Sequence, residues 1–310
     1  EDFSRELPGK AEEIKKRMEA LSPDIVIGMK YLYSNMPYSD VGNYTFDTYL
    51  DYVQQGIYLW ENSPYVKNYP ELYFLNYVLF HRTNDEEIKP CRTYFWKKIK
   101  DKVQGKAMVE AALEINHWCA GEVMYQGTDM RTGSALEIYR SGVGRCGEEA
   151  VFVVNVMRSA GIPARPVYVP RWSHCDDNHA WVEVWCDGDW HYLGACEPEA
   201  VLDKGWFTNA ASRAMMIGSR WYDRAMPDEK VIGKDGMNRI INLLGKYAKT
   251  RWITITVEDL DGTPAAGAKV RAEVMNYGEF SPIAIMEADK NGCISFETGF
   301  GSLLICAVYD

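Results

Sequence analysis

The 310-residue sequence lacks a basic stripe that could offset phosphates, and its formal net charge at pH 7 is −10. A protein that binds nucleic acid needs a basic patch or stripe to offset the phosphates, so no nucleic-acid partner is expected. A polybasic membrane anchor is missing for the same reason. Long apolar runs are also absent, since none reaches the roughly 18 to 20 residues that a helix needs to span a bilayer. The sequence therefore predicts no membrane span.

The eight cysteines lack the spacing of a metal site. They form no CxxC pair and stand at no finger-like distance from histidine, so we expect no structural zinc and no other bound metal. A dense disulfide framework is unnecessary at this length, and cysteine use therefore does not fix the cellular compartment. The composition, 47% apolar and 25% charged, is typical of globular proteins.

Residues 1–105 are predicted to be mostly helical. Ile14, Met18 and Leu21 recur at helical spacing with charged residues between them, and residues 69–81 form an aromatic-rich segment with little polar surface. This region contains no repeat and no recognisable chemical signature. We expect it to form a helical layer that supports the next domain.

Residues 106–250 change from helix to strand. Residues 106–125 predict an amphipathic helix, and the segment AVFVVNVM predicts a buried helix because it is apolar nearly all round. Three strand-like segments follow, ARPVYVP, HAWVEVWC and WHYLGAC, and Asp187-Gly188 between the last two is a strong hairpin signal. Residues 204–247 are expected to return to mixed loop and helix.

Residues 251–310 read as short alternating strands, RWITITVED, AKVRAEVMNY, CISFETG and SLLICAVYD, separated by turn-forming segments. This pattern predicts a small β-sandwich. The stretches DGTPAAGAKV and ADKNGCISF resemble the carboxypeptidase-regulatory-like and related Ig-like modules. The resemblance implies a secreted, periplasmic or cell-surface protein, and we expect the module to continue beyond residue 310.

Cys146 stands behind a Gly-Val-Gly-Arg turn and directly ahead of the apolar helix. Unpaired amide groups and the dipole at the start of a helix favour a thiolate over a thiol. A backbone N–H at the same turn can donate to a developing oxyanion. Glycines at 142, 144 and 147 would let a substrate approach the sulfur. The sequence therefore predicts that Cys146 is a nucleophile.

His179 begins a predicted strand 33 residues after the cysteine. An imidazole beside a thiol can take its proton and later return it to a leaving amine. A third group should orient that imidazole, and the segment CEPE offers Glu197 and Glu199. Among these residues we expect a Cys–His–acid site made by Cys146, His179 and Glu197.

This order of a cysteine-bearing helix, a hairpin that begins with histidine and a following acid resembles the transglutaminase-like superfamily. The residues that carry the resemblance are GVGRCGEEAVFVVNVMRSAGIPARPVYV, NHAWVEVW with the later DG and W, and the Glu-Pro that follows, over roughly residues 110–198. The resemblance implies a papain-like core, with Cys146 as nucleophile and His179 as base. It implies no cofactor.

The acid departs from the family pattern. The family usually places an Asp four residues after the tryptophan that follows the hairpin turn, but here Trp190 is followed by Gly194, and the Pro-linked acid is Glu197. An ideal hairpin would set His179 opposite Cys196, so that Glu197 points to the other face. A bulge near Gly194 would bring Glu197 back, and we favour this arrangement. Otherwise another group holds the imidazole, or the site is a weak dyad.

Other polar residues near the motif have less specific interpretations. A second oxyanion donor should come from upstream of the cysteine, where Gln126, Tyr125 and Trp118 are candidates. The remaining histidines nearby, His117, His174 and His191, are expected to be structural or surface residues, with His191 the alternative base. Structural or lining roles are likewise expected for Cys196 and Arg165. The segment Asp176-Asp177-Asn178 offers too few ligands for calcium.

Together these features predict an α+β fold with a helical N-terminal region (1–105), a papain-like transglutaminase core (106–250) and a C-terminal β-sandwich (251–310). The expected chemistry is acyl transfer from an amide of a protein, peptide or cell-wall peptide through a thioester. Water as the second nucleophile would make the protein a hydrolase or peptidase, which the resemblance favours, and an amine would make it a crosslinking enzyme. A non-catalytic module that binds peptide or glycan is the rival interpretation, kept open by the glycine at 194.

Overall fold

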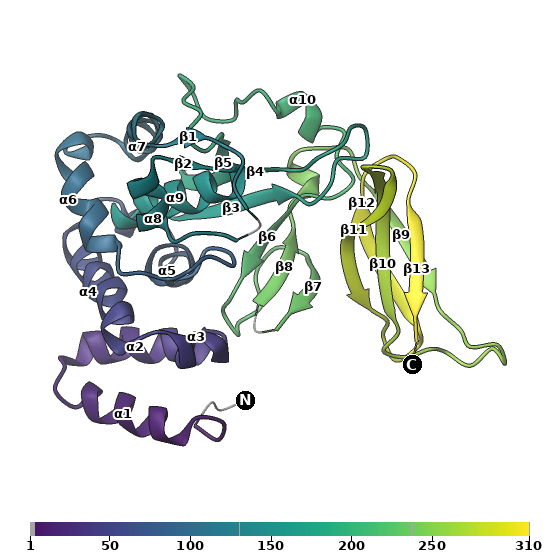
Figure 1. Ribbon diagram of the computed structural model, residues 1–310, viewed down its shortest axis with the longest axis horizontal. Helices are drawn as coiled ribbons and strands as arrows, with labels where there is room; N and C mark the ends of the chain where they lie inside the picture. Colours follow the sequence, from purple (N-terminus) through teal and green to yellow (C-terminus); the bar gives the residue numbers. More distant parts are fainter. Residues whose placement is uncertain (1–3, 130, 237, 310) are drawn as a thin grey trace. The chain divides into compact units, whose positions relative to one another are not determined.

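The computed structural model describes residues 4–129, 131–236 and 238–309 (Figure 1). The chain divides into two compact units that interleave along the sequence. The first unit comprises Glu1–Pro166, Trp181–Lys204 and Tyr222–Arg224. The second comprises Val167–Ala180, Gly205–Trp221 and Ala225–Asp310. Strands β3 (Ala164–Val169) and β4 (His179–Cys186) contribute residues to both.

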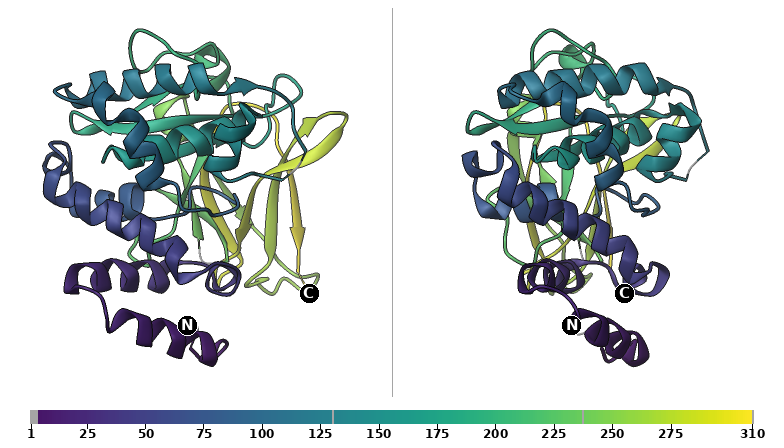
Figure 2. Two further views of the ribbon diagram at one scale, coloured as in Figure 1. Left: turned by 60° about the vertical axis from the view of Figure 1, so that its left-hand side comes forward. Right: turned by 90° about the vertical axis from the view of Figure 1, so that its left-hand side faces the viewer.

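The first unit is mainly helical, as the sequence predicts. Its helices are α1 (Pro8–Met18), α2 (Pro23–Asn35), α3 (Tyr38–Asn43), α4 (Phe46–Asn62), α5 (Glu71–Phe74), α6 (Arg92–Val103), α7 (Met108–Glu122), α8 (Ala135–Ser141) and α9 (Cys146–Ser159), with a 3-10 turn at Val66–Asn68 and a π-turn at Leu75–Leu79. In both views of Figure 2 the purple helix α1 lies at the outer edge, next to α2. No helix among the described residues is both long and apolar enough to cross a bilayer.

Helix α9 is the centre of the first unit. Helices α6, α7 and α8 all pack against it, and every residue from 148 to 159 is buried. The apolar segment predicted to be a buried helix therefore forms one. The side chain of Phe152 is fully buried and contacts the rings of Phe95, Trp118 and Tyr139.

Strands β4 and β5 (Asp189–Leu193) form the predicted hairpin, with Cys186 opposite Asp189 and Val182 opposite Leu193. Asp187 and Gly188 both have positive φ angles, 52° and 92°. Two such residues make the turn whose twist matches that of the flanking strands. The predicted register is confirmed up to Leu193, where β5 ends.

The second unit contains an antiparallel sheet that the sequence did not predict. It is part of a six-stranded sheet with the order β5-β4-β3-β6-β8-β7, to which this region adds β6 (Gly218–Trp221), β7 (Val231–Asp235) and β8 (Asn238–Asn242). The expectation of mixed loop and helix for residues 204–247 is therefore wrong in this part. Only α10 (Thr208–Ala211) and a 3-10 turn, Leu244–Lys246, are helical there. Strands of four or five residues are too short for periodicity to distinguish them from loops.

The rest of the second unit is the predicted β-sandwich, drawn in light green to yellow in Figure 1. One layer has the strand order β11-β10-β13, and the other pairs β12 with β9. Their bounds are β9 (Arg251–Thr256), β10 (Lys269–Asn276), β11 (Glu279–Glu287), β12 (Cys293–Thr298) and β13 (Leu304–Val308). Alternating residues such as Val270, Ala272 and Val274 fill the core between the layers, together with Met215 from the preceding segment.

Candidate active site

Cys146 is the first residue of α9, and its side chain is half-buried. The chain reaches it through the two-residue strand β2 (Val143–Gly144), which pairs in parallel with β1 (Met124–Tyr125). The amide of Gln126 also donates to the carbonyl oxygen of Gly144 at 2.9 Å. The predicted position at the start of a buried helix is thus confirmed. The amide groups of the first helical turn and the helix dipole favour the thiolate there.

Glu148 fixes the turn that leads into Cys146. Its buried carboxylate accepts the Arg145 amide at 3.2 Å, the Thr128 hydroxyl at 2.6 Å and the Gly133 amide at 3.1 Å. A glutamate at the third helical position commonly closes back on the capping residue, so the sequence contained a signal for this role. Sequence reasoning missed it because the partners at 128 and 133 belong to a loop.

The local structure explains why two of the residues before the cysteine are glycines. Gly142 ends α8 with a φ of +70°, the left-handed region that favours glycine. A Cβ at Gly144 would lie 3.0 Å from the Cβ of Glu148, closer than nearly all real contacts. These two glycines are therefore required by the backbone and by packing, whatever their part in substrate access.

Residues 194–197 form a tight turn where a bulge was expected. The Glu197 amide donates to the Gly194 carbonyl oxygen at 3.2 Å, and the two residues form an isolated antiparallel bridge. Cys196 takes a positive φ of 57° inside the turn. The turn returns Glu197 to a position beside Gly194, three residues earlier in the chain.

The Glu197 side chain fills the space that a side chain at position 194 would need. A Cβ at Gly194 would collide with Glu197 Oε2 and lie 2.8 Å from Glu197 Cβ. Position 194 is where the resemblance places the family's acid. Glycine at 194 and glutamate at 197 therefore depend on each other, because the Glu197 carboxylate occupies the space that a side chain at 194 would need.

Asn116 on α7 holds this turn. Its Nδ2 donates to the Gly194 carbonyl oxygen at 2.9 Å, and its Oδ1 accepts the Cys196 amide at 3.1 Å. The side chain is buried. Sequence reasoning missed Asn116, although a lone asparagine on the apolar face of a helix, between Ala112 and Cys119, was an available signal.

Glu149 is a second buried carboxyl close to the turn, one helical turn after Cys146. Its side chain is 4% exposed. Burial raises the pKa of Glu149 to about 8, and the negative charge of Glu197 adds to the effect. Burial and the same two carboxyls also raise the pKa of the Cys196 thiol. The Cys196 thiol is thus protonated near pH 7, and sequence reasoning did not anticipate a buried carboxyl at Glu149 close to Glu197.

His179 is the first residue of β4 and belongs to the second unit, whereas Cys146 and Glu197 belong to the first. Its imidazole is 7% exposed and contacts the rings of Trp206 and Phe207, with centroid distances of 4.6 and 5.1 Å. Burial lowers the pKa of His179 to about 4, against a smaller opposing effect of Asp177. The imidazole is therefore neutral near pH 7 and able to accept a proton.

The other predicted residues have structural partners. Arg165 forms the expected buried ion pair with Glu183, 2.6 Å apart. His191 Nδ1 lies 2.6 Å from Asp203 Oδ2, and His117 is exposed on α7. The Trp118 indole stacks on Tyr139.

The two other candidates for the second oxyanion donor, Tyr125 and Gln126, are exposed, and the backbone N–H of Gln126 already bonds to Gly144. Among the described residues, no group of three or more His, Cys, Asp or Glu is arranged to hold a metal ion.

Residues 97–195 match the model of the transglutaminase-like superfamily. The chain carries a transglutaminase-like domain. The matched residues of this domain include Cys146 and His179 and end two residues before Glu197. Glu197 thus lies just outside the part that the family model describes.

Searches for whole-chain relatives add little beyond this domain. No curated protein matches the chain. Three solved structures are similar over parts of their length: a proposed cysteine protease from Cytophaga hutchinsonii (18% identity, TM-score 0.29), a proposed protease from Parabacteroides distasonis (12%, 0.30) and red sea bream transglutaminase (10%, 0.33). The alignments cover 49%, 69% and 84% of this chain and 57%, 37% and 54% of those chains. Such low scores assign no function.

Proposed function

We propose that the transglutaminase-like domain catalyses cysteine-dependent acyl transfer on amide bonds through a thioester. The observation that carries the proposal is the placement of Cys146, which begins the buried helix α9 inside the matched domain. A half-buried cysteine that only filled space would not need the hydrogen-bonded turn that leads into it.

In the proposed reaction His179 acts as the base. The Cys146 thiol gives its proton to the imidazole while the sulfur bonds to the amide carbonyl carbon, and His179 returns that proton to the amine as the C–N bond breaks. Water then attacks the thioester, and the proton it loses passes through His179 to the Cys146 sulfur. A His179 pKa of about 4 favours proton transfer during attack over a resting thiolate–imidazolium pair.

Glu197 is proposed to orient the imidazole. Its support is the turn that brings its carboxylate into the space of the absent side chain at 194. The proposal predicts that an acid at position 194 can replace the one at 197. Glu197→Ala should lower the His179-dependent alkylation rate of Cys146 about tenfold. The double variant Gly194→Asp with Glu197→Ala should restore part of that rate. Gly194→Asp alone should destabilise the fold, because its Cβ meets Glu197. A double variant no better than Glu197→Ala would assign the acid elsewhere.

Hydrolysis is favoured over crosslinking, and the sandwich supports a secreted, periplasmic or cell-surface location with a protein or cell-wall peptide as substrate. Both preferences rest on resemblance. Incubation with denatured casein and a fluorescent primary amine separates the outcomes, because cleavage shortens the casein while crosslinking makes it fluorescent. Inactivity of the wild type in both assays, together with an ordinary thiol profile in the test below, would favour the non-catalytic module.

The test of the site is the pH dependence of Cys146 alkylation by iodoacetamide, followed by mass spectrometry of the peptide that contains Cys146. We expect a rate that rises well below the free-thiol pKa of about 8.5 and falls about 100-fold at pH 6.5 in His179→Ala. His191→Ala is the matched control and should change little. A pH dependence typical of a free thiol, and the same in the wild type and in His179→Ala, would refute the catalytic proposal.

A further inference from the structure

The loop that leads into His179 is held by the C-terminal sandwich. Residues 170–178 connect β3 to β4, and their partner is Asn276, the last residue of β10. The loop, His179 and Asn276 all belong to the second unit. The loop and its holder are thus far apart in sequence, with 104 residues between Trp172 and Asn276.

The Asn276 side chain bonds to the backbone of this loop. Its Nδ2 donates to the carbonyl oxygens of Trp172, Cys175 and Asp177 at 3.0, 3.2 and 3.2 Å. Its Oδ1 accepts the Asp177 amide at 3.3 Å. The side chain is 1% exposed, so water cannot easily replace these bonds. An amide is required, because the site needs both a donor group facing three carbonyls and an acceptor facing an N–H.

The bonds hold a backbone that includes one unfavourable conformation. Asp177 has a φ of +89°, which residues with a side chain rarely adopt. It lies two residues before His179. The next residue of the hairpin also contributes, since the Tyr277 amide donates to Asp176 Oδ1 at 2.6 Å. Asn276 and Tyr277 together clamp both residues of the Asp176-Asp177 pair.

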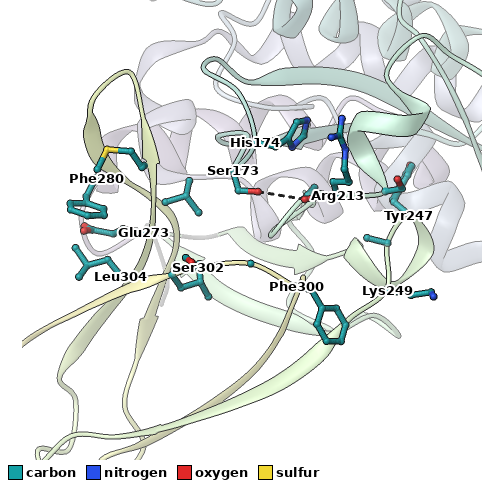
Figure 3. Close-up of a pocket in the computed structure, with 17 residues that line it drawn as sticks. Ser173, His174, Arg213, Tyr247, Lys249, Glu273, Phe280, Phe300, Ser302 and Leu304 are labelled. Atoms are coloured by element: carbon teal, nitrogen blue, oxygen red, sulfur yellow. Dashed lines mark hydrogen bonds between the residues drawn. The ribbon is translucent and has the colours of Figure 1, made fainter.

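One face of the loop borders a cavity of about 970 Å³, which Ser173 and His174 line together with Arg213, Phe300 and Leu304 (Figure 3). Ser173 makes one long hydrogen bond there, from its hydroxyl to the Arg213 carbonyl oxygen at 3.4 Å. Trp172 near the start of the loop is buried, but residues 173–178 are exposed. Hydrogen bonds rather than buried apolar contacts must therefore hold this later part of the loop.

We infer that Asn276 is a positioning residue for His179, and that the sandwich is thereby a working part of the catalytic site. The inference rests on the proposed function for its chemical consequence. Asn276 touches no reacting atom. It fixes the backbone at Asp177 and so fixes where β4 begins and how the imidazole is presented.

The experiment compares Asn276→Ala, Asn276→Asp and the matched control Asn291→Ala, which removes an exposed asparagine of the same sandwich. In Asn276→Ala, hydrogen exchange of the amides at 172–178 should accelerate, and Cys146 alkylation at pH 6.5 should fall about tenfold toward the His179→Ala value. Asn291→Ala should leave both unchanged.

Asn276→Asp gives a signature that mere loss of stability would not produce. A protonated aspartic acid keeps one donor and one acceptor, whereas a carboxylate faces three carbonyl oxygens. Its alkylation rate, as a fraction of wild type, should therefore be lowest at pH 8 and recover at pH 5. If Asn276→Ala fails to fold, Asp176→Ala, which removes the acceptor of the Tyr277 amide, should give the same changes on a smaller scale.

The outcomes separate the two proposals. An alkylation rate of Cys146 that is the same in the wild type and in His179→Ala would refute the proposed function. Faster hydrogen exchange of the amides at 172–178 in Asn276→Ala would still establish that Asn276 holds the loop. His179-dependent alkylation that survives in Asn276→Ala, with no pH-dependent recovery in Asn276→Asp, would overturn the inference.

Discussion

Cys146 at the start of α9 and His179 at the start of β4 are held in position by different physical means. Cys146 begins a helix whose later residues are all buried among α6, α7 and α8, so apolar packing fixes its position. His179 follows a loop whose exposed part borders a cavity and is held mainly by hydrogen bonds to Asn276 and Tyr277. Packing fixes a residue through contacts with many side chains, whereas hydrogen bonding fixes it through a few donor and acceptor atoms. The two sites should therefore respond differently to substitution.

The largest effect on stability is expected in α9, which is held by apolar packing. Phe152→Ala removes a fully buried ring from the middle of α9 and should lower the free energy of unfolding by about 3 to 5 kcal/mol. Denaturant titration measures this loss. Phe280→Ala, at an exposed ring of the sandwich, is the control and should change stability little. A small loss in Phe152→Ala would show that α9 is not held by packing.

A smaller effect on stability should come from Glu149, a buried carboxyl on the same helix. The Glu149 pKa of about 8 lies above the ordinary value of 4.5, so between these pH values the folded state keeps a proton that the unfolded chain has lost. Stability from this group is present below about pH 4.5 and declines as pH rises to about 8. Glu149→Gln removes the titration and should stabilise the protein at pH 8 by about 2 kcal/mol.

Thermal or denaturant unfolding at pH 5 and pH 8 checks this prediction. Glu61→Gln, on an exposed face of α4, is the matched control. An equal effect of Glu149→Gln at both pH values would mean that Glu149 does not hold a proton in the folded state.

The smallest effect on stability, but a clear one on pH dependence, is expected at His179. Trp206 is 65% exposed, yet its ring covers the imidazole, so Trp206→Ala should admit water to His179 and raise its pKa from about 4 toward 6.5. A protonated imidazole cannot accept the thiol proton. Alkylation of Cys146 should therefore slow at pH 5 and stay unchanged at pH 8.

The control for this variant is Trp252→Ala, which removes another exposed indole, on β9. If the pH profile of Trp206→Ala overlies that of the wild type, covering by Trp206 does not keep the imidazole neutral.

Sequence reasoning identified the parts of the site that local patterns encode. The apolar run after Cys146 and the Asp187-Gly188 turn specify a helix and a hairpin by short-range rules, and both are present. The turn at residues 194–197 was expected only as a bulge. Its shape depends on a positive φ at Cys196 and on Asn116, 80 residues away, which no local pattern reports.

Long-range partners explain the remaining misses. Glu149 sits near Glu197 only after the chain folds, and Asn276 reads in the sequence as an ordinary end of a strand. The strands between 218 and 242 were missed because each acquires its pattern from its neighbours in the sheet. Local composition could not reveal any of these contacts.

The clamp at Asn276 also has a consequence for synthesis. A ribosome makes the chain from its N-terminus, and domains generally begin to fold as they emerge. The loop before His179 emerges roughly a hundred residues ahead of the asparagine that shapes it. A nascent chain can therefore complete the helix that carries Cys146 while its histidine loop is still unshaped. On the proposed function, the newly made protein holds its base in place only once the β10–β11 hairpin has formed, so synthesis of the chain itself delays the reactive state.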